Sequence, residues 1–106
     1  MSEWLEIAKK RPRELIFTGN DGYEKIRNGD GIDEKIFELD SLNFLEITKT
    51  PIEWLPPKVE CLLNLTNLVI CENQLITVPS EICHLKKLKF LDLSHNQLSK
   101  YTGDTS

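Results

Sequence analysis

The 106-residue chain lacks the features of several specialised protein classes. It has no run of 18 apolar residues, so no membrane span is expected. Its formal net charge is −4, which is not the basic surplus of a dedicated nucleic-acid-binding domain. The first residues are charged and include no long apolar stretch, so they do not read as a secretory signal. We therefore expect one domain in the cytoplasm, with the nucleus as a second compartment.

Cysteine is scarce, and the motifs of catalysis are absent. The three cysteines, Cys61, Cys71 and Cys83, form no CxxC pair, which predicts reduced thiols in an intracellular protein. A metal site needs three or four converging ligands, and these cysteines with His84 supply too few. No GxSxG, Gly-rich phosphate loop or HExxH occurs. We expect no cofactor, no metal, no small-molecule substrate and no enzymatic activity.

The chain does contain an internal repeat with a period of 23 residues. Residues 88–98 carry leucines and an asparagine at fixed spacing, and the same pattern begins 23 and 46 residues earlier. Thr50 alone departs from it, at the position of the asparagine. The second half of each period also recurs, with Pro56 and Pro79 at equivalent positions. Three repeats are therefore expected over residues 32–100.

This pattern, LxxLxLxxNxL followed by xxLPxxIxxLxx, resembles that of leucine-rich repeats. The resemblance implies an α/β fold: a right-handed solenoid with short parallel strands on its concave face. In each LxL segment the leucines would point into the core and the residues between them outward. The proline-containing segments would return along the convex side as extended chain or short helical turns, with Trp54 packing over the neighbouring N-terminal segment.

The two ends of the chain are predicted to differ. Residues 1–31 are expected to form a helical N-terminal cap, because a terminal repeat shields an open core end. This cap would contain a helix through Lys10 with Trp4, Leu5 and Ala8 on one side, a degenerate strand at 13–20, and a short helical turn, with an insertion at 23–31.

After residue 98 the repeat pattern requires an apolar residue and then proline, but the chain has Tyr101 and Thr102. Residues 101–106 are therefore expected to be a flexible tail without a C-terminal cap. The chain would then be a natural short form or part of a longer repeat protein. A second copy of the chain is one expected occupant of the open end, through Leu91, Leu93, Leu98 and Tyr101.

A narrower resemblance covers nearly the whole chain and is carried by residues 6–48. Arg13-Glu14-Leu15, Thr18-Gly19 and the segment 39–47 resemble the amino-terminal region of the leucine-rich repeat-containing protein 47 family. That family carries a later domain similar to part of the phenylalanyl-tRNA synthetase beta chain, so the resemblance implies an RNA- or tRNA-associated protein as an alternative. Nothing in this chain matches the later domain. The repeats also resemble the Ras-pathway scaffold class, which implies a scaffold fragment.

The outward positions of the strands form the candidate binding site for another protein or peptide. Exposed aromatic side chains with a charged rim are typical of binding hot spots, whereas the alternative is a set of scattered surface residues that bind nothing. The expected partner-binding residues are Phe44, Glu46, Asn67, Val69, Cys71, Glu72, Phe90, Asp92 and Ser94, with Thr48 on the same face. RNA is not favoured, and the basic run Lys9–Arg13 is interpreted as the solvated end of a helix rather than a phosphate contact or nuclear-import signal.

Overall fold

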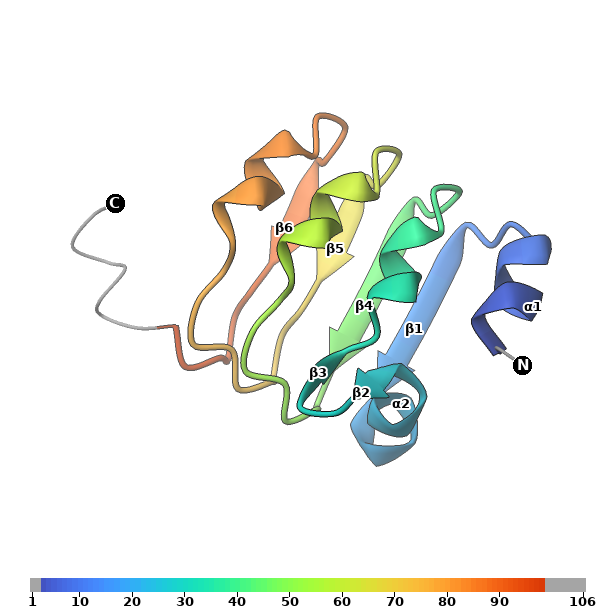
Figure 1. Ribbon diagram of the computed structural model, residues 1–106. Helices are drawn as coiled ribbons and strands as arrows, with labels where there is room; N and C mark the ends of the chain where they lie inside the picture. Colours follow the sequence, from blue (N-terminus) through green and yellow to red (C-terminus); the bar gives the residue numbers. More distant parts are fainter. Residues whose placement is uncertain (1–2, 99–106) are drawn as a thin grey trace.

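The computed structural model describes residues 3–98 as a mixed α/β fold built around one parallel sheet (Figure 1). Strands β1, β4, β5 and β6 lie in this order in the sheet, and β2 and β3 form a separate antiparallel pair. Three 3₁₀ helices form a second layer against the sheet (Figure 1). The elements are α1 (Glu3–Lys9), β1 (Glu14–Thr18), α2 (Gly19–Ile26), β2 (Arg27–Asn28), β3 (Gly31–Ile32), η1 (Glu34–Glu38), β4 (Phe44–Thr48), η2 (Pro57–Cys61), β5 (Asn67–Val69), η3 (Ser80–His84) and β6 (Phe90–Asp92).

The register of the sheet matches the period of the sequence. Phe44 pairs with Asn67, which pairs with Phe90, so neighbouring strands are offset by 23 residues. Glu14 pairs with Phe44, an offset of 30, as the degenerate strand predicts. Equivalent residues of successive repeats therefore stand side by side along the sheet.

The return segments are short because 23 residues leave room for a strand and about one helical turn. Pro56 and Pro79 hold extended backbone directly before η2 and η3. Val59 and Leu62 are fully buried in one return segment, and Leu85 is buried in the next. These segments confirm the predicted short helical turns and their inward-facing side chains.

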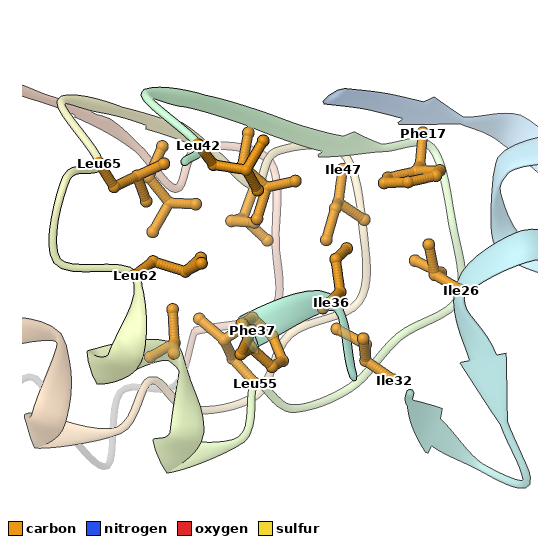
Figure 2. Packing of buried hydrophobic residues seen from close by; sticks show 14 of the residues in the cluster. Phe17, Ile26, Ile32, Ile36, Phe37, Leu42, Ile47, Leu55, Leu62 and Leu65 are labelled. Atoms are coloured by element: carbon orange, nitrogen blue, oxygen red, sulfur yellow. The ribbon is translucent and has the colours of Figure 1, made fainter. Parts of the chain in front are cut away.

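The core fills the space between the sheet and the 3₁₀ helices (Figure 2). Side chains from both layers meet there, and burying such residues is the main favourable contribution to folding. The fully buried large side chains are Phe37, Ile26, Ile36, Leu42, Leu45, Ile47, Ile52, Leu62, Leu65, Leu68, Ile70 and Leu75.

Asparagine side chains bond the turns after β5 and β6 to the preceding repeat. The Asn73 Nδ2 group donates to the Ile47 carbonyl at 2.8 Å. Its Oδ1 atom accepts from the Thr50 backbone N–H at 2.9 Å and the Thr50 hydroxyl at 2.8 Å. Asn96 repeats the first bond, donating to the Ile70 carbonyl at 2.7 Å. Thr50, the one departure from the repeat pattern, thus bonds the asparagine of the next repeat.

The N-terminal region contains more structure than its sequence indicated. The insertion predicted at 23–31 is part of α2 and of the β2–β3 hairpin, whose turn includes Gly29 at φ +64°. Helix α1 lies beside β1 (Figure 1), and the Trp4 ring meets the Phe17 ring at 6.0 Å. The predicted inner face of this helix was partly wrong. Leu5 and Ala8 are exposed, and Ile7 packs with Trp4 against the core.

Strand β6 forms the other edge of the sheet. Leu91 on this strand is 41% exposed, whereas Leu45 and Leu68, its counterparts on β4 and β5, are fully buried. The predicted tail at 101–106, including Tyr101, lies outside the described residues.

Candidate functional site

The outward side chains of β1, β4, β5 and β6, with the residues that follow each strand, form one surface that we call the strand face. All nine predicted partner-binding residues lie on it, in rows set by the register of the sheet. The first row contains Phe44, Asn67 and Phe90; the second contains Glu46, Val69 and Asp92; Cys71, Glu72 and Ser94 follow β5 and β6.

The first row places an amide between two aromatic rings. Phe90 is 50% exposed and Phe44 is half-buried. Between them, the Asn67 Oδ1 atom accepts a hydrogen bond from the Thr66 hydroxyl at 2.8 Å, which orients the amide. This row can therefore offer apolar contact area together with one polar group.

The second row alternates apolar and acidic side chains. Ile16 on β1 is 56% exposed and stands beside Glu46, which is followed by Val69 and Asp92. Asp92 Oδ1 accepts from the Ser94 hydroxyl at 2.7 Å and from the Ser94 backbone N–H at 3.0 Å. These bonds, aided by the nearby His95, lower the pKa of the Asp92 carboxyl, which stays ionised at neutral pH.

The third row contains Thr48 on the strand face, as predicted, but the side chain is buried there by its neighbours. Its hydroxyl lies 3.0 Å from Thr18 Oγ1 and 3.3 Å from Glu46 Oε2. Its neighbour Cys71 is half-buried. Burial raises the pKa of the Cys71 thiol, and Asp92, Glu72 and Glu46 raise it further, in that order. The third row thus has a neutral thiol near three carboxylates.

A left-handed backbone residue follows each of the last three strands. Lys49, Glu72 and His95 have φ angles of 58°, 59° and 57° and exposed side chains. Such angles are uncommon outside glycine, so the equivalent turn adopts one shape in three successive repeats. That shape puts one polar, ionisable side chain at the same place in each repeat.

The basic run bonds to groups of the chain itself. Lys9 lies 3.6 Å from Glu6, and Arg11 lies 3.8 Å from Asp40. Arg13 Nη1 donates to Asn43 Oδ1 at 3.2 Å. These contacts are solvent-exposed and therefore weak, but they occupy three of the four cations of the run.

Cys61 of η2 and Cys83 of η3 are exposed and free. His84 Nδ1 lies 2.6 Å from Glu60 Oε1 and joins η3 to η2. Within residues 3–98, no three His, Cys, Asp or Glu side chains are grouped so as to hold a metal ion. Nor does any helix in the described part of the chain have the length and apolar character needed to cross a bilayer.

Sequence reasoning gave Trp54 only a packing role. Its indole does lie against Gly31, as expected, but the side chain also stays 43% exposed beside an open hollow of about 440 Å³. The sequence contains a signal for this contact. Gly31 and Trp54 are 23 residues apart, which is one repeat period, so they lie at equivalent positions and the glycine leaves room for the indole.

A protein-family model matches more than half of the chain. Residues 40–98 match the family model described as leucine rich repeat. No curated protein shows a significant match to the chain.

Proposed function

Because the chain belongs to the leucine-rich-repeat family, we propose that it is a protein–protein interaction module that binds another protein or peptide on its strand face. Repeat domains of this kind present an extended surface to partners and are typically not enzymes. In this proposal the repeats form a right-handed solenoid with the strand face on its concave side, and residues 1–31 act as its N-terminal cap.

The arrangement of the strand face supports this proposal. Phe44 and Phe90 flank the oriented Asn67 amide, so two aromatic anchors lie on one rigid sheet. Such anchors lose little conformational entropy on binding because strands hold them in place. Aromatic side chains on a preorganised surface are one arrangement that favours a binding hot spot.

The charges of this surface define the partner that it fits best. Glu46, Glu72 and Asp92 lie close enough to Cys71 to raise the pKa of its thiol. A basic or mixed-charge segment would place its cations opposite these carboxylates while its apolar side chains contact the phenylalanines. We propose the cytoplasm as the compartment, because three free cysteines suit a reducing environment.

The narrower resemblances stay secondary to this proposal. Membership of the leucine-rich repeat-containing protein 47 family would add RNA or tRNA association, and a Ras-pathway scaffold would add assembly of signalling proteins. RNA association is disfavoured by the net charge of −4 and by the internal contacts of Arg11 and Arg13.

The test compares partner capture by the wild-type chain and by a Phe44→Ala/Phe90→Ala variant, quantified by mass spectrometry. A Leu63→Ala/Ile76→Ala variant is the matched control, because both residues are exposed and lie off the strand face. We expect a set of proteins to be lost with the first variant and retained with the second. Identical sets from wild type and a folded Phe44→Ala/Phe90→Ala variant would overturn the proposal.

A further inference from the structure

A second surface, sharing no residue with the strand face, surrounds Trp54. The hollow there has a volume of about 440 Å³ and is open to solvent. Three parts of the chain form it: α2, the turn of the β2–β3 hairpin, and the segment after β4. Its lining residues are Tyr23, Asp30, Pro51, Glu53 and Trp54.

The position of the Trp54 ring is fixed by its neighbour. A Cβ atom built on Gly31 would lie 2.8 Å from Trp54 Cζ2 and 3.2 Å from Cη2, so the indole packs directly on the glycine backbone. Trp54 is 43% exposed and lines both this hollow and the adjoining one. A large aromatic surface is thus held rigidly and left accessible to solvent.

The carboxylates of the hollow are available to a ligand. Asp30 and Glu53 are exposed, and neither forms an ion pair with any described residue. The adjoining hollow shares Asp30 and Trp54 with this one, but it also contains Lys35 and Lys58, and its Glu38 is paired with Lys58 at 3.1 Å. The hollow of Tyr23 and Trp54 therefore carries two uncompensated negative charges.

One aromatic ring of the hollow already contacts a guanidinium group of the chain itself. The Arg27 Cζ atom lies 5.9 Å from the centroid of the Tyr23 ring, within the range of a cation–π contact. Arg27 also lies 3.8 Å from Glu24, so its charge is shared with a carboxylate next to the ring. Trp54, the better cation–π acceptor, has no cation assigned to it among the described residues.

We propose that this hollow binds an arginine side chain of a partner peptide, with the guanidinium stacked on Trp54 between the carboxylates of Asp30 and Glu53. Arginine suits the site better than lysine because its planar group stacks on an aromatic face and offers several donors to carboxylates. The partner is therefore a protein segment with an accessible arginine.

The test follows the indole N–H signals of the two tryptophans by NMR. Trp4 is 8% exposed and serves as the internal reference, while a Trp54→Phe variant assigns the second signal. The probe is the acetylated and amidated peptide Gly-Arg-Gly-Arg-Gly, and the control peptide has citrulline in place of arginine. We expect the arginine peptide to shift the Trp54 signal in a saturable way and to leave Trp4 unmoved, whereas the citrulline peptide shifts neither.

An Asp30→Asn/Glu53→Gln variant, which keeps the shape of both side chains, should bind the arginine peptide about fivefold more weakly. Glu6→Gln/Glu81→Gln removes the same charge elsewhere and should leave the affinity nearly unchanged. Equal binding by the Asp30→Asn/Glu53→Gln variant, an equal response to citrulline, or an unmoved Trp54 signal would overturn the proposal. The Phe44→Ala/Phe90→Ala variant should still show the Trp54 shift with the arginine peptide. The proposal for the hollow is therefore tested independently of the proposal for the strand face.

Discussion

The two ends of the sheet present the same kinds of residue to different surroundings. At the N-terminal end, Leu15 of β1 is half-buried against the core, and the ring of Phe17 on the same strand contacts Trp4 of α1. At the other end, Leu91 of β6 is 41% exposed, although it occupies the register position of Leu15 and of the fully buried Leu68. The difference arises from what lies beside each strand, not from the repeat pattern.

This comparison shows that a repeat position does not by itself determine burial. Leu68 is covered because β4 and β6 flank it on both sides, while Leu91 has one strand neighbour. In a stack of repeats, stability is roughly the sum of each repeat and its contacts with its neighbours. A leucine at the same repeat position should therefore contribute less to the free energy of unfolding on β6 than on β5.

The largest expected effect is a difference between two identical substitutions. Leu68→Ala removes a fully buried side chain and should lower the free energy of unfolding by about 3 kcal/mol. Leu91→Ala should cost about 1 kcal/mol, because much of the side chain is already in water. Urea denaturation of both variants and wild type measures the two losses.

Equal losses would contradict this gradient, and would indicate that β6 is covered in solution. Light scattering at high protein concentration then separates the causes, since a second copy on Leu91 gives a dimer. A strict monomer would remove self-association through this edge.

A smaller difference is expected between the two asparagines of the turns. Asn73 is buried, and its amide bonds both Thr50 and the Ile47 carbonyl. Asn73→Ala should cost about 2 kcal/mol, because buried backbone groups would lose their partners. Asn96→Ala should cost about 1 kcal/mol, since Asn96 is only half-buried. Thermal unfolding of both variants tests the order, and a larger loss for Asn96→Ala would contradict it.

The repeat was predictable because its signal is carried by many residues at once. A period of 23 in the sequence is sufficient to pair Phe44 with Asn67 and Phe90, and to place the predicted partner-binding residues on one face. Periodicity of this kind is read from spacing alone and needs no knowledge of contacts. The binding role of these residues remains a prediction.

The N-terminal region was predictable only in outline, because its contacts have no period. The i, i+3 spacing of Trp4 and Ile7 is a local signal that places them on one side of α1, with Leu5 off that side; how α1 meets β1 then decides which side is buried. The burial of Thr48 likewise reflects its neighbour Thr18 on the next strand, 30 residues away in the chain. Tertiary contacts decide these positions.

The smallest expected effect concerns the alkylation rate of the Cys71 thiol, which follows β5. Since the pKa of Cys71 is raised, less thiolate is present at pH 8, and iodoacetamide should alkylate Cys71 more slowly than the exposed Cys61 and Cys83. Asp92→Asn keeps an oxygen that can accept from Ser94 but removes the carboxylate that raises the Cys71 pKa most. This variant should therefore speed alkylation of Cys71 about twofold. Glu46→Gln, on the covered side, should do so by less, because its charge raises the pKa less. Mass spectrometry of peptides after timed alkylation gives each rate. A greater acceleration by Glu46→Gln would mean that the covered side, and not β6, dominates the electrostatics of the strand face.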